Sequence, residues 1–225
     1  MLNLFDIFSK VKFRLSVKNN LMLNKPVLLN VGAGGTYYPG WISVEKKQLD
    51  ITKPDTFSDF FPLGSIKAIL VEHVIEHITE EEFIRFMVGI REFLRSDANI
   101  RIAVPDALHP SIYVRDLTRP GGLEPGADDH KEFYSVYKMR NISKKIGYKL
   151  IPVEYFDQNG FFKYKEEDWS RGYIARSFRN YRGRFTTNKN EYNKMIESTP
   201  IELRHQFSEL NMSYTSLIVD FKVQR

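Results

Sequence analysis

The stretch Val27-Leu28-Leu29-Asn30-Val31-Gly32-Ala33-Gly34-Gly35 is a short apolar run that ends abruptly in glycines. Buried parallel strands have this continuous apolar character, and a glycine-rich turn often follows them. Gly32 and Gly34 can adopt backbone angles that other residues avoid, and without Cβ atoms they let a ligand approach the main chain. Open α/β sheets bind nucleotide-like ligands at this kind of junction. The stretch predicts either a ligand-binding turn or only a tight turn, and the residues that follow must distinguish the two.

The composition of the 225-residue chain is that of an ordinary soluble globular protein. We divide it into an N-terminal amphipathic helix or extension, residues 1–25, and one domain, residues 26–225. Because there is no cysteine, disulfides and thiolate chemistry are excluded. No apolar run approaches the roughly 18 residues that span a bilayer, and we find no signal peptide, so we expect a cytoplasmic protein.

Two segments of the chain are basic and free of acids, and the formal net charge is +5. The first lies between Asp6 and Glu45. The second lies between Asp168 and Glu191 and carries its basic residues at positions 171–189. Each segment predicts contact with phosphate, anionic lipid or an acidic substrate, or else an ordinary solvated surface.

Residues 2–17 form a predicted basic amphipathic helix, and Asn19-Asn20 predicts a break after it. Its apolar side chains at helical spacing are Leu4, Phe8, Val11 and Leu15. This face either packs on the domain or lies on a membrane surface, which would make the protein a peripheral membrane protein.

The rest of the chain alternates strand and helix patterns, which indicates an α/β fold with a parallel sheet. Thr79-Glu80-Glu81-Glu82 is a capping box, and it opens a helix whose apolar face extends to Leu94. Further strands are predicted at residues 41–44, 66–71, 99–105, 149–156, 161–164 and 214–221. Segments at about 106–131 and 157–210 are expected to be substrate or lid segments, the first irregular and the second including a helix that Pro200 opens.

Three residues that follow the second strand indicate a nucleoside site. Glu45 stands 13 positions after Gly32, where a carboxylate at the end of the neighbouring strand can accept both hydrogen bonds of a ribose diol. Asp50 can accept a hydrogen bond from the exocyclic amine of an adenine-like base, and Ile51 can cover the face of that base. The alternatives are an ordinary surface glutamate and a simple turn aspartate.

The segment Glu72-His73-Val74-Ile75-Glu76-His77 permits two interpretations. His73, Glu76 and His77 fit H-x-x-E-H, a zinc-hydrolase pattern in which two histidines bind metal and the glutamate is the base. A zinc peptidase, however, would carry this pattern inside a long helix. In the other interpretation Glu72 and His73 lie at the carboxyl tip of a parallel strand, where ligands bind, and His77 is structural. We assign no metal ligand.

Four motifs, taken in order, resemble the class I S-adenosylmethionine-dependent methyltransferases, and among them the small bacterial type 11 group. The motifs are residues 28–35, 39–45, 72–77 and 101–106. The similarity is strong from Val27 to Asp106 and looser at residues 129–131, 154–160 and 214–220.

The resemblance implies a Rossmann-like α/β fold: a seven-stranded sheet, mostly parallel with an antiparallel last strand, and helices on both faces. It also implies S-adenosylmethionine as cofactor, bound by Asn30, Gly32, Ala33, Gly34, Glu45, Asp50, Ile51 and Glu72. The glycines would approach the methionine part, Glu45 the ribose, and main chain near Glu72 the amino-acid end. The chain departs from the family at Asn30, where an acid is common, at Thr36, where a third glycine is common, and at Glu45, where many relatives have aspartate.

The activity that the resemblance implies is methyl transfer to an oxygen or nitrogen of a small-molecule or glycan-type acceptor. Since the donor is already activated, the protein must position the acceptor, exclude water and, where needed, remove a proton. Histidine suits the last task, and the catalytic candidates are His73 and His130. Their alternatives are a packing role and a plain loop residue.

Two other functions compete with methyl transfer. One is a catalytically inactive cofactor-binding or interaction protein with the same fold, and the lesser one is the zinc hydrolase. A nucleic-acid partner is not expected, because no known RNA-binding module is appended to the core.

Overall fold

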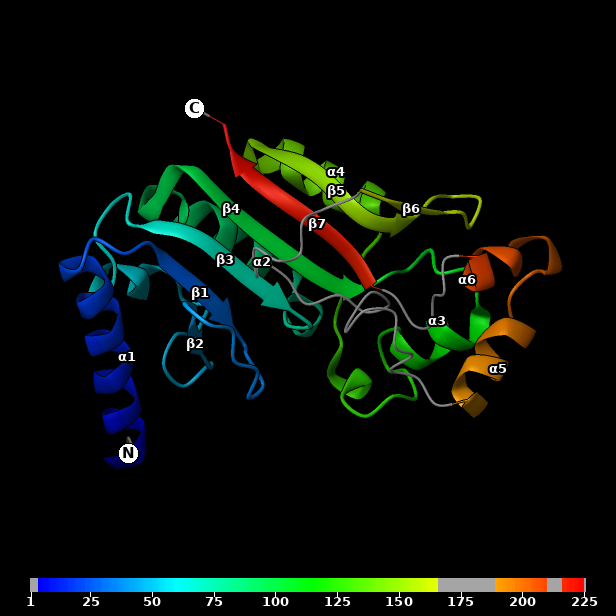
Figure 1. The fold of residues 1–225 in the computed structure, drawn as a ribbon, viewed down its shortest axis with the longest axis horizontal. Coiled ribbons are helices and arrows are strands. Elements are labelled where there is room, and N and C mark those ends of the chain that lie inside the picture. Colours follow the sequence, from blue (N-terminus) through cyan, green and yellow to red (C-terminus); the bar gives the residue numbers. More distant parts are fainter. Residues whose placement is uncertain (1–3, 166–188, 210–215, 225) are drawn as a thin grey trace.

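The computed structural model describes residues 4–165, 189–209 and 216–224, and within them one seven-stranded sheet has the order β2-β1-β3-β4-β7-β5-β6 (Figure 1). The strands are β1 (Val27–Val31), β2 (Ile42–Val44), β3 (Ile66–Glu72), β4 (Leu94–Pro105), β5 (Tyr148–Phe156), β6 (Phe162–Tyr164) and β7 (Ser216–Val223). Strands β1 to β4 pair in parallel, whereas β7 pairs antiparallel with β4 and β5, and β6 pairs antiparallel with β5. Five strands therefore share one direction, which confirms the predicted Rossmann-like α/β class.

Within the described residues, helices cover one face of this sheet and gather at one end of it, which differs from the helices on both faces that the resemblance implies. The helices are α1 (Leu4–Met22), α2 (Glu80–Gly89), α3 (Ile112–Thr118), α4 (Val136–Ile146), α5 (Lys189–Glu197) and α6 (His205–Glu209). Short 3-10 helices are η1 (Pro54–Asp59), η2 (Ile75–His77), η3 (Arg91–Phe93), η4 (Ala127–Asp129) and η6 (Ile201–Leu203). None of the described helices is long and apolar enough to cross a bilayer.

The main core lies between the sheet and the helices α2 and α4. Alternate residues of β3, Ile69 and Val71, belong to this core, while Ala68 and Leu70 belong to a separate small cluster. Because successive strand residues point to opposite faces, that cluster lies on the other face of the sheet. A further cluster joins α3, α5, α6 and β6, and Figure 1 shows these helices beyond the carboxyl end of β4. Its members are Val114, Phe156, Phe162, Met195 and Phe207.

Helix α1 is longer than the sequence predicts. It does not break at Asn19-Asn20 but continues to Met22. The chain turns at Asn24, whose φ of 49° is left-handed and whose N–H donates to the Leu21 carbonyl over 3.1 Å. Asparagine tolerates this conformation and so ends helices as glycine does.

Helix α1 also packs through a different face from the predicted one. Phe13 and Val17 are buried in the main core. Phe8, Val11 and Leu15, which the periodicity selects, are 73%, 49% and 60% exposed. The expectation that this stripe packs on the domain is therefore wrong, because tertiary contact is made by the neighbouring face of the helix.

Helix α2 is shorter than predicted, since it ends at Gly89 and Leu94 already begins β4. Glycine is a poor helix former. It is also required there, because a Cβ at Gly89 would lie 2.5 Å from Cβ of Pro54. The helix thus ends at a glycine that the contact with η1 requires, and the apolar pattern continues through the 3-10 helix η3.

The two predicted lid segments contain more helix than expected. Helix α3 lies inside segment 106–131, and Ser111 caps it by accepting a hydrogen bond from the Val114 N–H over 3.2 Å. In segment 157–210, α5 is not predicted, and the helix expected after Pro200 is divided into η6 and α6. The basic residues from 171 to 188 lie outside the described residues, and Lys189 begins α5.

Candidate active site

The carboxyl ends of the parallel strands form the candidate site, and the strand order locates its centre. From β1 the chain passes to β2 on one side and then to β3 on the other. Such a reversal is a topological switch point, and open α/β sheets bind ligands in the crevice outside it. The glycine turn after β1, Glu45 after β2 and Glu72 at the end of β3 all reach this place.

Gly32 makes the turn tight. Its φ is 65°, and its N–H donates to the Val44 carbonyl over 2.8 Å, which joins the end of β1 to β2. A Cβ at this position would lie 2.4 Å from Cγ2 of Val74, in the loop after β3. Only glycine lets the ends of β1 and β3 approach this closely.

Gly34 and Glu45 are brought together as the sequence predicts. The Gly34 N–H donates to Oε1 of Glu45 over 2.8 Å, and Gln48 Oε1 accepts from the Glu45 N–H over 2.7 Å. Among the described residues, and apart from its two neighbours in the chain, no atom lies within 4 Å of a Cβ built on Gly34, which leaves room for a ligand at the main chain. Ala33 between the two glycines is buried.

Asn30 lies beneath this turn and is only 2% exposed. Within the described residues its Nδ2 is buried without a hydrogen-bond partner. A buried donor left unpaired costs roughly 1–3 kcal/mol, so such a group in a native fold calls for a specific reason. A ligand or water at the switch point would supply the missing acceptor.

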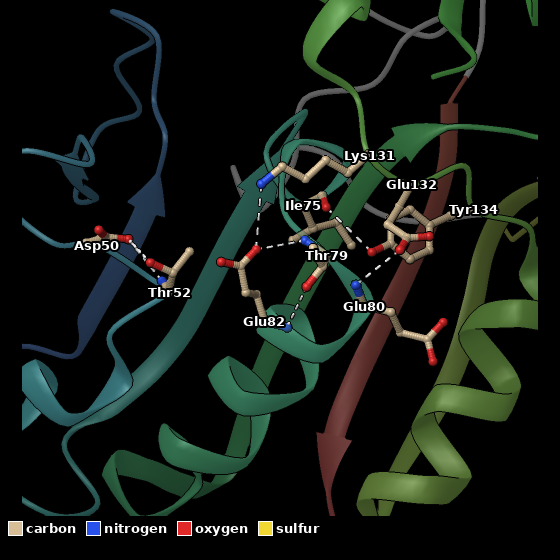
Figure 2. Close-up of polar contacts among 9 residues, drawn as sticks. All are labelled: Asp50, Thr52, Ile75, Thr79, Glu80, Glu82, Lys131, Glu132 and Tyr134. Carbon is tan, nitrogen blue, oxygen red and sulfur yellow. Dashed lines mark hydrogen bonds and ion pairs between the residues drawn. The ribbon is translucent and has the colours of Figure 1, made fainter. Parts of the chain in front are cut away.

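Asp50 and Ile51 do not present the arrangement expected for an adenine site. Both the N–H and the hydroxyl of Thr52 donate to Oδ1 of Asp50, over 3.0 and 2.7 Å (Figure 2). The side chain of Ile51 is buried in the main core. Asp50 does line a cavity of about 400 Å³ between α1 and the loop after β2. Lys46, Lys47 and Lys53 line the same cavity.

Glu72 ends β3 in a partly buried position. Its Oε2 accepts a hydrogen bond from the Tyr38 hydroxyl over 3.3 Å. Burial raises the pKa of Glu72, while the neighbouring His73 and the Tyr38 hydrogen bond act in the opposite direction. No pattern in the sequence indicated Tyr38 as a partner of Glu72.

His73 occupies a strained position directly after β3. Its φ is 51°, a conformation that costs a non-glycine residue of the order of 1–3 kcal/mol. Its N–H donates to the Ala103 carbonyl over 2.9 Å, Nδ1 lies 3.1 Å from Glu76 Oε1, and Nε2 lies 3.3 Å from Ser216 Oγ. One backbone contact and two ring contacts therefore hold a residue whose side chain is still 48% exposed.

The pKa of His73 is raised above its ordinary value. Burial is the largest single influence and lowers this pKa, but the hydrogen bond and charge of Glu76, with the charges of Glu72 and Glu124, outweigh it. Strained backbone and a shifted pKa at a ligand-binding edge are features of functional sites.

Two further histidines, His77 and His130, lie near His73. His73, Glu76, His77, Glu124 and His130 share one cavity of about 250 Å³. The rings of His77 and His130 meet edge to face with centroids 4.6 Å apart. The structure therefore brings both catalytic candidates to one cavity, and the 106–131 segment forms part of its wall.

The chain after His130 is tied to the beginning of α2, and Figure 2 shows these contacts. Glu132 Oε1 accepts from the Glu80 N–H over 3.2 Å, and the Tyr134 hydroxyl donates to the Ile75 carbonyl over 3.5 Å. Lys131 Nζ lies 3.8 Å from Glu82 Oε2. These links hold His130 beside η2.

The zinc-peptidase arrangement is not formed by His73, Glu76 and His77. The pattern spans a strained loop residue and the three-residue η2, not a long helix. The group of possible metal ligands found in the described residues contains His130 in place of His73. No short pattern could have indicated this, because His130 is 53 positions beyond His77 in the sequence.

No model of a known protein family matches the sequence, and no curated protein matches it. Among solved structures, a SAM dependent methyltransferase from Archaeoglobus fulgidus is 11% identical with a TM-score of 0.44, over 97% of this chain and 98% of that one. The 1,6-didemethyltoxoflavin-N1-methyltransferase of Burkholderia thailandensis is 11% identical with a TM-score of 0.38, over 65% and 70%. The YcgJ protein of Bacillus subtilis is 11% identical with a TM-score of 0.40, over 93% and 99%. Similarities this low carry no conclusion about activity, which has to be argued from the residues.

Proposed function

We propose that this protein is an S-adenosylmethionine-dependent methyltransferase. The observation that carries the proposal is the glycine turn at the switch point of the sheet, with the Glu45 carboxylate 2.8 Å from the Gly34 nitrogen. An open glycine main chain beside a carboxylate at the end of the next strand suits a nucleoside that carries an amino-acid tail.

The residues of the site fit this cofactor in two further respects. The unpaired Nδ2 of Asn30 lies buried beneath the turn, and Gly34 leaves space above it. When bound, S-adenosylmethionine supplies an activated methyl group. In this proposal Glu45 holds the ribose, the Gly32–Gly34 main chain holds the methionine part, and the main chain at Glu72 holds its amino-acid end.

The acceptor in this proposal lies in the cavity beside His73 and receives the methyl group on oxygen or nitrogen. A volume of about 250 Å³ suits a small molecule or one sugar unit of a glycan. His73 is the first candidate for the group that takes the acceptor proton, because two hydrogen-bond contacts hold its ring at the cavity wall. His130 is the second.

Thermal unfolding with and without S-adenosylhomocysteine tests the cofactor site. At a ligand concentration about a hundredfold above Kd, linkage predicts roughly 2.7 kcal/mol of stabilisation. For a chain of this size that is a rise in Tm of roughly 5–10 °C. Glu45→Ala should lose this rise, and the exposed Glu202→Ala should keep it. No rise in the wild type at millimolar ligand would overturn the proposal.

Transfer of a labelled methyl group from S-adenosylmethionine to a panel of hydroxyl and amine acceptors then tests turnover. Binding of the cofactor without transfer to any acceptor would favour the inactive binding protein instead.

We further propose that α1 rests on an anionic membrane surface. Phe8 and Leu15 are 73% and 60% exposed on a helix that also carries Lys10, Lys12, Arg14 and Lys18. An exposed apolar stripe with flanking basic residues fits the boundary between headgroups and acyl chains. The double change Phe8→Ser with Leu15→Ser should reduce co-sedimentation with anionic vesicles, whereas Val88→Ser, at another exposed apolar residue, should not. Equal binding by both variants would refute the contact.

A further inference from the structure

The cavity beside His73 holds a convergent group of metal-ligand types. Glu76, His77 and His130 each offer one ligand atom, and within the described residues these atoms lie within 4.8 Å of one another. Glu76 and His77 come from η2, and His130 directly follows η4. Two segments far apart in the sequence thus supply two nitrogens and one oxygen to one point.

The hydrogen bonds of both histidines leave the same ring nitrogen available. His77 Nδ1 lies 2.5 Å from Asp129 Oδ1, and His130 Nδ1 lies 2.8 Å from the Thr118 carbonyl oxygen. Because carbonyl and carboxylate oxygens accept hydrogen bonds, Nδ1 is the donor in each ring, and in the neutral form of the ring Nε2 then carries the lone pair. Metal-binding histidines typically donate their second N–H to a carboxylate or a backbone carbonyl in this way.

Glu76 supplies the third donor, and it is otherwise unexplained. The residue is 1% exposed, and its Oε1 is occupied by His73 Nδ1 at 3.1 Å. Its Oε2 is buried and has no hydrogen-bond partner among the described residues. A buried carboxylate oxygen without a partner is costly, and a cation at the cavity wall would satisfy it.

We propose that Glu76 Oε2, His77 Nε2 and His130 Nε2 bind one divalent transition-metal ion. Two histidines and one carboxylate are the donor set of catalytic zinc and of non-haem iron(II) sites, in which the remaining positions stay open. Ligand atoms at about 2.1 Å from an ion stand closer together than 4.8 Å, so rotation of these side chains completes the site. His73 orients Glu76 and is not a ligand.

Glu76, His77 and His130 all line the cavity in which the proposed acceptor lies, so an ion that they bind would have its remaining positions available to that acceptor. This step rests on the proposed methyltransferase function. It limits the candidate acceptors to compounds that can offer an oxygen ligand to the metal, such as a hydroxyl next to a second oxygen.

Metal titration of the chelator-treated full-length protein tests the site without reference to methyl transfer. Zinc binding is followed by calorimetry, and cobalt(II) binding by its visible absorption. We expect one ion per chain in the wild type. His130→Ala should weaken binding about a hundredfold or more, since loss of an outer-shell partner alone costs roughly 10–100-fold. Asp129→Asn should show that smaller loss, and His205→Ala, at an exposed histidine outside the cavity, should bind like the wild type.

Circular dichroism of the metal-free His130→Ala and Asp129→Asn variants separates loss of the site from loss of the fold. Absence of stoichiometric binding in the wild type would overturn the proposal. So would binding that His130→Ala leaves intact and His73→Ala abolishes, which would restore the H-x-x-E-H ligand set. Stabilisation by S-adenosylhomocysteine is measured on the same samples, so failure of the metal site and failure of the cofactor site are distinguished.

Discussion

Two features of the structure require glycine at position 32: a left-handed backbone conformation and a close contact with Val74. An alanine there must adopt a φ of 65° and must also place its Cβ 2.4 Å from Cγ2 of Val74. The backbone conformation costs about 1–2 kcal/mol, and the overlap costs about 1–3 kcal/mol more. Gly40 is the matched control, with a φ of 83° and nothing within 4 Å of an added Cβ. In urea unfolding, Gly32→Ala should therefore lose more stability than Gly40→Ala, and equal losses would contradict the close packing of this turn.

Asp106 is a buried acid that joins β4 to β5. Its Oδ1 accepts from the Leu108 N–H over 2.9 Å, and its Oδ2 accepts from the Phe156 N–H over 2.8 Å. Burial raises the pKa of Asp106 to about 7, although both hydrogen bonds act to lower it. The folded protein therefore holds a proton here at pH values at which the unfolded chain, with a pKa near 3.9, has lost it.

This shift predicts a stability that falls as pH rises. The contribution of the protonated acid is fully present below about pH 4 and is lost as pH rises towards 7, because in that range the folded state binds more protons than the unfolded state. The loss is of the order of 4 kcal/mol. Asp106→Asn cannot ionise, so its free energy of unfolding should fall less than that of the wild type between pH 4.5 and pH 8. Parallel pH profiles for the two proteins would rule out the raised pKa.

At the scale of elements, the beginning of α2 is defined by a reciprocal cap (Figure 2). Thr79 Oγ1 accepts from the Glu82 N–H over 3.2 Å, and Glu82 Oε2 accepts from the Thr79 N–H over 2.9 Å. Removing such a cap costs about 1 kcal/mol, within a range of roughly 0.5–2. Thr79→Ala should show this loss in chemical denaturation, and Thr79→Ser, which keeps the hydroxyl, should stay near the wild type. If the two variants were equally destabilised, the methyl group and not the cap would be responsible.

At the scale of the whole molecule, one buried ion pair joins the parallel part of the sheet to its antiparallel part. Arg101 on β4 and Asp220 on β7 stand opposite each other in register. Two hydrogen bonds of 2.5 and 2.6 Å connect the guanidinium to the carboxylate, and the side chains are only 5% and 9% exposed. Removal of the Asp220 carboxylate takes two charge-assisted hydrogen bonds from a guanidinium that is only 5% exposed.

Asp220→Ala should therefore destabilise the protein by about 3–5 kcal/mol. The control is Asp116→Ala, which breaks the exposed pair with Arg119 and should cost at most about 1 kcal/mol. Both values come from denaturant unfolding monitored by circular dichroism. A small loss at Asp220 would mean that water or another group compensates Arg101 once the carboxylate is gone.

Several parts of the fold were predictable because their causes are local. The glycine turn and the capping box at Thr79 each depend on residues within a few positions of one another. The errors arose where a distant contact decided the result. The contact with Pro54 requires glycine at position 89, where α2 ends, and the core contains Phe13 and Val17 of α1 instead of the more regular stripe.

The sequence by itself determined the sheet class and the position of five residues at the carboxyl edge of the sheet: Gly32, Gly34, Glu45, Glu72 and His73. This was possible because the end of each apolar run marks the end of its strand locally in the sequence. Only the tertiary structure decided that His130 joins Glu76 and His77 while His73 holds Glu76 from the other side. That assembly depends on the path of the chain between η2 and η4 and on the anchoring of Lys131 and Glu132 at α2. His130 is more than fifty residues beyond Glu76 and His77, so no periodicity or spacing in the sequence could specify it.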